Sequence, residues 1–126
     1  TVFELVPEAR LVAAIGGAGT DQDNQGIGKL QKLAEELGIS DKISWKNYIA
    51  DEDLANVYRS ANIFVMPSRY EPFGMVAIEA MACGTPSIIT VHGGLCDLID
   101  FGNQGLFADP HRPKEFGAMM AMPNVC

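Results

Sequence analysis

The sequence predicts an α/β fold in which a parallel sheet carries helices on both faces. Short apolar runs that suit buried strands alternate with segments whose apolar residues recur at helical spacing. Strands that alternate with helices are joined by right-handed crossovers, and the sheet that they build is parallel. We therefore expect a single doubly wound, three-layer, Rossmann-like domain over residues 1–126, without internal repeats.

The expected strands are short and mostly apolar. RLVAAIGG (10–17) is a continuous apolar run closed by glycines, which indicates a strand buried on both faces. KISWKNYI (42–49) alternates apolar and polar residues, and NIFVMP (62–67) is stopped by its proline. Two more strands are expected at PSIITV (86–91) and QGLFAD (104–109).

The expected helices lie between these strands. Apolar residues recur every three or four positions in QGIGKLQKLAEELG (25–38), and Gly38 suits a C-terminal cap. DEDLANVYRSA (51–61) opens on Asp51, which is a favourable N-cap residue. Further helices are expected at GMVAIEAMACG (74–84), after the glycines of HGGLCDLI (92–99), and at PKEFGAMMAM (113–122).

Composition excludes several classes of partner. The net charge is −7 and the pI is about 4.6, so the chain lacks the basic surface that nucleic acid or anionic lipid requires. No apolar run approaches the roughly 18–20 residues of a membrane span, and the first ten residues do not form a secretory signal. Any phosphate-binding site must therefore rely on backbone amides, helix N-termini or a few basic side chains.

Cysteine and histidine give no pattern of metal ligands. The odd number of cysteines (Cys83, Cys96 and Cys126) favours free thiols in a reducing cytoplasm. His92 and His111 do not lie at metal-ligand spacing from each other or from a cysteine. We expect a cytoplasmic protein with no metal site and no cofactor.

Ligands of doubly wound sheets bind beyond the carboxyl ends of the strands, which restricts the site to four loops. These loops are Gly16–Gly19, Asn47–Asp51, Pro67–Phe73 and His92–Leu95. In the first, GGAGTD lacks the last glycine of a dinucleotide fingerprint, because Gln22 stands at that position. Its glycines either let the chain turn or approach a sugar phosphate, and His92 either faces the ligand or is a hydrogen-bonded loop residue.

The segment SRYEPFGMVAIEAMACGTP (68–86) contains two glutamates with contrasting surroundings. Glu71 precedes the predicted helix, where its charge is favoured by the positive end of the helix dipole. Glu79 lies among apolar and small residues on a helix that should be buried almost all round, so its carboxylate needs hydrogen-bond donors. Those donors are either a lysine, an arginine or a backbone amide of the protein, or ligand hydroxyls such as the vicinal pair of a ribose.

EPFGMVAIEAMACGTPSIIT (71–90) resembles the E-x7-E motif of retaining glycosyltransferases with two Rossmann-like domains (GT-B fold, glycosyltransferase family 4). YRSANIFVMPSRYEPFG before it and HGGLCDLIDFGNQGLFADP after it extend the resemblance, which looks closest to the sucrose-phosphate and mannosylfructose-phosphate synthase branch. The resemblance covers nearly the whole chain. It implies a C-terminal, nucleotide-sugar-binding domain that is truncated at both ends.

The resemblance also implies roles for individual residues. Glu71 would bind the donor hexose near the reacting centre, and Glu79 would bind the ribose hydroxyls. The backbone amides of Phe73, Gly74 and Met75 would hold sugar hydroxyls. The remaining contacts to a UDP- or GDP-hexose would come from Gly16, Gly17, Asn47, Tyr48 and Ile49.

In such enzymes the acceptor attacks as the diphosphate leaves, through an oxocarbenium-like step with no protein nucleophile and no divalent metal. The Arg and Lys that neutralise the diphosphate normally precede the point where this sequence starts, and the acceptor-binding domain is missing too. The expectation is a donor-binding part of an enzyme that transfers a hexose to a sugar or sugar phosphate, inactive as an isolated chain. The alternative is a non-catalytic module that self-associates through an exposed sheet edge.

Overall fold

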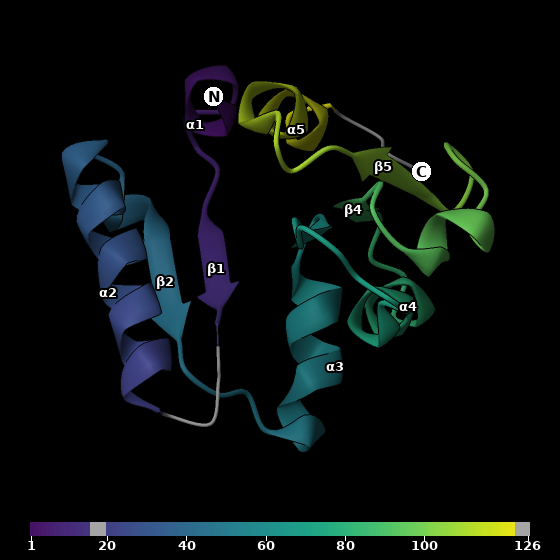
Figure 1. Ribbon diagram of the computed structural model, residues 1–126, viewed down its shortest axis with the longest axis horizontal. Helices are drawn as coiled ribbons and strands as arrows, with labels where there is room; N and C mark the ends of the chain where they lie inside the picture. The colour runs from purple at the N-terminus through teal and green to yellow at the C-terminus, as the bar shows by residue number, and fades with distance from the viewer. Residues whose placement is uncertain (16–19, 123–126) are drawn as a thin grey trace. The chain divides into compact units, whose positions relative to one another are not determined.

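The computed structural model describes residues 1–15 and 20–122 and divides into two compact units (Figure 1). Unit 1 comprises Thr1–Pro7 together with Glu52–Cys126, and unit 2 comprises Glu8–Asp51. All strand pairs within the sheets are parallel, and the predicted Rossmann-like fold class is confirmed. The expectation of a single domain stays a prediction.

Unit 2 is built on a pair of parallel strands. β1 (Leu11–Ala14) pairs with β2 (Ile43–Lys46), and α2 (Asp21–Glu36) and a 3₁₀ turn, η1 (Ser40–Lys42), connect them. The prediction that the first strand is buried on both faces was wrong. Within β1 Ala13 alone is buried, because a sheet of two strands and one helix offers few side chains to cover it.

The helix of unit 2 begins earlier than the apolar spacing predicted. The Thr20 hydroxyl accepts a hydrogen bond from the Asp23 amide at 3.2 Å, and an Asp23 carboxylate oxygen accepts one from the Thr20 amide at 3.2 Å. This reciprocal capping box satisfies two backbone donors and starts the helix at Asp21. The polar residues before Ile27 therefore belong to the helix and not to a loop.

Replacing Thr20 by alanine is expected to lower the free energy of unfolding by about 1 kcal/mol, because one helix donor loses its partner. The measurement is chemical denaturation monitored by circular dichroism. Thr20→Ser, which keeps the hydroxyl, is the matched control and should unfold close to the unaltered chain. Equal losses in both variants would mean that the hydroxyl does not cap α2.

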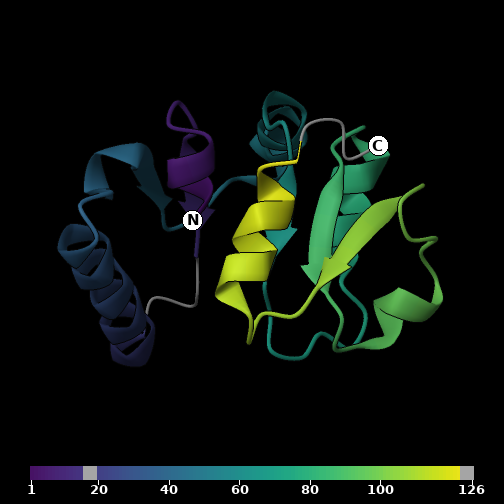
Figure 2. The ribbon, with the colours of Figure 1, turned by 90° about the horizontal axis from the view of Figure 1, so that it is seen from above.

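Unit 1 contains a three-stranded parallel sheet with β4 at its centre (Figure 2). The strands are β3 (Phe64–Met66), β4 (Ser87–Thr90) and β5 (Gly105–Ala108). The helices of this unit are α1 (Val2–Leu5), α3 (Asp51–Ser60), α4 (Met75–Ala82) and α5 (Pro113–Met120), with a 3₁₀ turn η2 (Gly94–Asp97). The predicted strands and helices of this part are confirmed with shorter bounds, whereas α1 was not predicted.

The core of unit 1 has two sides because neighbouring strand residues point to opposite faces. Ile89 packs in a cluster with Ala77 of α4 and Leu95 of η2. Ile88 packs in a second cluster with Phe116 of α5. The sheet is thus covered by α4 on one face and by α5 on the other, as a doubly wound sheet requires.

In the described part of the chain, no helix is both long enough and apolar enough to cross a membrane. Cys83 and Cys96 are free thiols, as predicted. Cys126 lies outside the described residues.

Candidate functional site

Two loops meet at the carboxyl ends of β3 and β4. The Glu71 amide donates a hydrogen bond to the His92 carbonyl at 2.9 Å, and Glu71 forms an isolated parallel bridge with Gly93. Gly93 has φ 151° and ψ −179°, a conformation that essentially glycine alone adopts. A β-carbon there would lie 1.8 Å from the Glu71 carbonyl oxygen. The missing side chain of Gly93 therefore allows the two backbones to touch and fixes the position of Glu71.

The Glu71 side chain is bound at the start of α4. Its Oε1 accepts a hydrogen bond from the Gly74 amide at 3.1 Å, and Gly74 is the left-handed N-cap residue of the helix at φ 74°. The Gly74 amide thus has a partner within the protein, and its expected contact with a sugar hydroxyl stays a prediction. The amides of Phe73 and Met75 have no hydrogen-bond partner within the described ranges, so they remain as donors near the half-buried carboxylate.

Glu79 is exposed, so the expectation of a buried carboxylate was wrong. Helix α4 buries the stripe formed by Ala77 and Ala80, and Glu79 lies beside that stripe. The Tyr58 hydroxyl of α3 donates a hydrogen bond to its Oε2 at 3.3 Å. This donor is a buried tyrosine and not the lysine, arginine or amide considered from the sequence. The carboxylate is thus oriented from one side and open to solvent on the other.

Tyr58 is held firmly enough to act as a fixed donor. Its ring packs edge-on against Phe64 with the centroids 5.7 Å apart, and its carbonyl accepts a hydrogen bond from the Thr85 hydroxyl. Burial, followed by the negative charge of Glu79, raises the pKa of the Tyr58 hydroxyl to about 12. The hydroxyl therefore keeps its proton, and its hydrogen bond to Glu79, over the physiological pH range.

The raised pKa of Tyr58 makes stability depend on pH in the alkaline range. Because the folded value is about 12 and the ordinary value is 10.0, its contribution is complete below pH 10 and is lost as pH rises toward 12. The free energy of unfolding of Tyr58→Phe is expected to fall less steeply between pH 10 and pH 12 than that of the unaltered chain. Denaturant midpoints at several alkaline pH values measure this, and parallel curves for the two proteins would contradict it.

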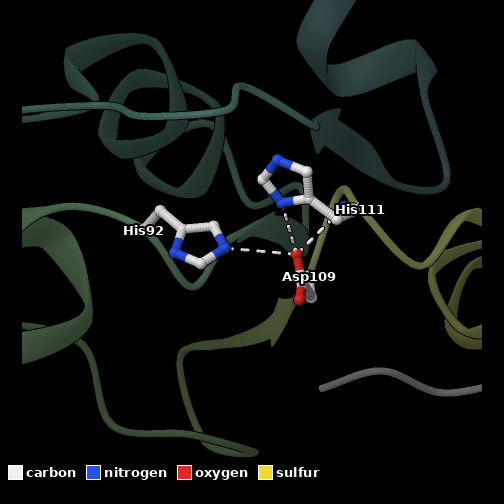
Figure 3. A group of neighbouring side chains, drawn as sticks. All are labelled: His92, Asp109 and His111. Atoms are coloured by element: carbon white, nitrogen blue, oxygen red, sulfur yellow. Dashed lines mark hydrogen bonds and ion pairs between the residues drawn. The ribbon is translucent and has the colours of Figure 1, made fainter.

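A third group of side chains lies beyond the carboxyl ends of β4 and β5 (Figure 3). One Asp109 oxygen, Oδ1, is hydrogen-bonded to His92 Nε2 at 3.1 Å and to His111 Nδ1 at 3.0 Å. The same oxygen also accepts a hydrogen bond from the His111 amide at 2.9 Å. Hydrogen bonds from the His111 amide, first, and then from His92 hold the pKa of Asp109 well below its ordinary value, at about 2. This carboxylate is therefore ionised at every physiological pH.

Sequence reasoning treated the two histidines separately and did not include Asp109. The two histidines are 19 positions apart in the sequence. They lie close together because His92 follows β4, His111 follows β5, and these strands are neighbours in the sheet. The signal was the position of both residues beyond the carboxyl ends of consecutive strands. For His92, the alternative of a hydrogen-bonded loop residue is the one that the contacts favour.

The remaining predicted residues lie in unit 2 or outside the described part. Asn47 and Tyr48 are exposed just after β2, and Ile49 is half-buried. They belong to unit 2, whereas the Glu71 and Glu79 groups belong to unit 1. Gly16 and Gly17 lie outside the described residues. Their predicted contacts with a ligand stay predictions.

Comparison with known proteins defines the class to which this fold and these motifs belong. Residues 2–121 match the family described as glycosyl transferases group 1, and the chain belongs to that family. It is 49% identical over 121 residues to mannosylfructose-phosphate synthase of Agrobacterium fabrum, covering 95% of this chain and 27% of that protein. D-inositol 3-phosphate glycosyltransferase of Corynebacterium jeikeium is 42% identical over 110 residues, covering 87% and 26%.

Solved structures agree with this assignment. Sucrose-phosphate synthase of Thermosynechococcus elongatus superposes with a TM-score of 0.83 and 34% identity, covering 93% of this chain and 29% of that one. HepE of Anabaena, solved in complex with UDP-glucose, shares the fold with a TM-score of 0.80 and 21% identity, covering 94% and 33%. The chain spans about a quarter to a third of the length of these proteins.

Proposed function

We propose that this chain is the donor-binding part of a retaining glycosyltransferase, which transfers a hexose from a nucleoside diphosphate to a sugar or sugar phosphate. Glu79 would accept hydrogen bonds from the ribose hydroxyls, and Glu71 would accept one from the hexose. The Phe73 and Met75 amides at the positive end of α4 would donate to oxygen atoms of the donor. The reaction needs no protein nucleophile, because its main requirement is stabilisation of the leaving diphosphate.

The observation that supports this proposal most strongly is the exposed, oriented carboxylate of Glu79. One of its oxygens is bound to the Tyr58 hydroxyl, which has a raised pKa and stays protonated. A carboxylate can accept about four hydrogen bonds, and Tyr58 occupies one of these positions. A vicinal diol supplies two hydroxyl donors at the spacing of one carboxylate, so a ribose fits what remains.

Calorimetric titration of the 126-residue chain with UDP, GDP and their hexose derivatives tests the proposal. Saturable binding of one nucleotide with its sugar would support a retained donor site, and the preferred nucleotide would identify the donor class. NAD is the matched negative control, since the sequence lacks the complete dinucleotide fingerprint. If neither UDP, GDP nor their hexose derivatives bind at millimolar concentration, the proposed donor site is refuted.

The isolated chain is expected to bind donor without turning it over. These 126 residues span 27% of the length of mannosylfructose-phosphate synthase, so the isolated chain is expected to lack some of the groups that stabilise the leaving diphosphate in the proposed reaction. The measurement is release of UDP or GDP in the presence of fructose 6-phosphate, with the donor that binds. Turnover above the rate without protein would contradict this expectation.

The alternative, a non-catalytic self-associating module, is favoured by one observation. Leu11 and Val12 of β1 and the following Ile15 are exposed, with exposed fractions of 36%, 51% and 41%. A short strand with exposed apolar side chains is a surface on which a second copy can pair. Light scattering at high protein concentration separates the two functions: a monomer would exclude the module, and a dimer without nucleotide binding would favour it.

A further inference from the structure

The side chains of His92, Asp109 and His111 form a compact cluster of potential metal ligands. His92 Nε2, His111 Nδ1 and a carboxylate oxygen of Asp109 all lie within 4.8 Å of one another. Figure 3 shows both imidazole rings directed at the same oxygen atom, with the Asp109 carboxylate between them. The cluster does not include the side chains of Glu71 or Glu79, and the proposed transfer reaction does not use the cluster's side chains.

Two of the three distances between ligand atoms in the cluster are close to those around a coordinated ion. Zinc binds histidine nitrogen and carboxylate oxygen at about 2.0–2.2 Å, so neighbouring ligand atoms of a tetrahedral site are about 3.3–3.5 Å apart. The nitrogen–oxygen distances here are 3.1 Å for His92 and 3.0 Å for His111. Small rotations of the rings would open the cluster enough to admit the ion.

The supporting contacts also suit a metal site. The His111 amide donates to Asp109 Oδ1 at 2.9 Å, which restrains the carboxylate as an outer-shell partner would. The His92 amide donates to the Thr90 hydroxyl at 3.1 Å, which restrains the start of that loop. All three side chains are partly accessible, with exposed fractions of 41%, 34% and 59% for His92, Asp109 and His111. An ion therefore has a route in, and a fourth position stays open to water.

We propose that His92, Asp109 and His111 bind a divalent transition-metal ion of the zinc class. Two imidazoles and one carboxylate are the ligand types that zinc accepts, whereas magnesium and calcium prefer sites made entirely of oxygen. The ion would connect the loop after β4 to the loop after β5. The His92 carbonyl accepts a hydrogen bond from the Glu71 amide, so the ion would also restrain the backbone that carries Glu71.

Titration with ZnCl₂ and CoCl₂ at neutral pH tests this proposal on the 126-residue chain. We expect one equivalent of Zn²⁺ by calorimetry and, with Co²⁺, the visible absorption of a four-coordinate site without sulfur charge-transfer bands. His92→Gln and His111→Gln are each expected to weaken binding at least tenfold. These are the two histidines of the chain, so the double variant removes every imidazole.

The matched control removes the cysteine thiols. A Cys83→Ser, Cys96→Ser, Cys126→Ser variant should bind the ion as the unaltered chain does. His111 is the most exposed of the three ligands, so His111→Gln should fold even where His92→Gln does not, and circular dichroism checks both. Unchanged Zn²⁺ affinity in His111→Gln, loss of binding in the cysteine variant, or absence of binding to the unaltered chain at millimolar ion would overturn the proposal. In that last case Asp109 is solely a hydrogen-bond acceptor between two histidines.

Discussion

Replacing Gly93 by alanine is expected to lower the free energy of unfolding by about 3 kcal/mol or more, the largest effect of a glycine-to-alanine change among the glycines that the structure describes. The added carbon would lie 1.8 Å from the Glu71 carbonyl oxygen, which is backbone and cannot swing aside as a side chain can. The strand-end loops would have to separate. The Glu71 amide would then lose the His92 carbonyl that it contacts at 2.9 Å.

Gly102→Ala provides the matched control for this effect. Gly102 also has a positive φ, of 84°, but nothing lies within 4 Å of the position that a β-carbon would take. It should therefore lose about 1 kcal/mol through backbone strain alone. Denaturant unfolding of both variants measures the difference. Similar losses at the two positions would mean that the Glu71 and Gly93 backbones do not approach each other closely.

Replacing Glu79 by alanine is expected to weaken nucleotide binding at least tenfold while leaving the fold intact. Hydrogen bonds to a charged acceptor contribute about 1.5–3 kcal/mol, and a tenfold change in affinity corresponds to about 1.4 kcal/mol. Because Glu79 is exposed, its removal should change stability by less than about 1 kcal/mol. Calorimetry with the bound nucleotide and thermal unfolding of the variant measure the two effects separately.

Glu115→Ala serves as the control for a general loss of negative charge, because Glu115 is an exposed glutamate on α5 of the same unit. It should bind nucleotide as the unaltered chain does. Equal binding by Glu79→Ala and the unaltered chain would remove Glu79 from the site. Equal weakening in both glutamate variants would indicate a long-range charge effect and not a contact.

Periodicity was sufficient to predict the fold class and the elements of unit 1 other than α1. Alternation of apolar strands with helices placed β3, β4 and β5 and the helices α4 and α5, with bounds shorter by a few residues at the ends. The start of α2 was missed because a capping box, Thr20 with Asp23, lies outside the apolar repeat that defined the helix. Local polar hydrogen bonds, and not hydrophobic spacing, decide such a boundary.

The sequence singled out Glu71 and Glu79 as candidate site residues, and their roles stay predictions, whereas the surroundings of Glu79 were predicted wrongly. Composition suggested burial for Glu79, because every neighbour on its helix is apolar or small. Burial depends on which face of α4 meets the sheet, and that face is the Ala77–Ala80 stripe. The Tyr58 contact and the histidine pair join residues 21 and 19 positions apart, which no local pattern reveals.

The most direct test of the proposed donor site compares the binding of a bare nucleotide with that of its sugar derivative in two glutamate variants. Glu79→Ala should weaken binding of UDP and UDP-hexose (or the GDP pair) equally, since both carry the ribose. Glu71→Gln keeps an oxygen for the Gly74 amide and should weaken the hexose derivative alone, several-fold or more. That pattern is the predicted result. If Glu71→Gln weakened the bare nucleotide as much as its hexose derivative, Glu71 and Glu79 would not bind opposite ends of one donor.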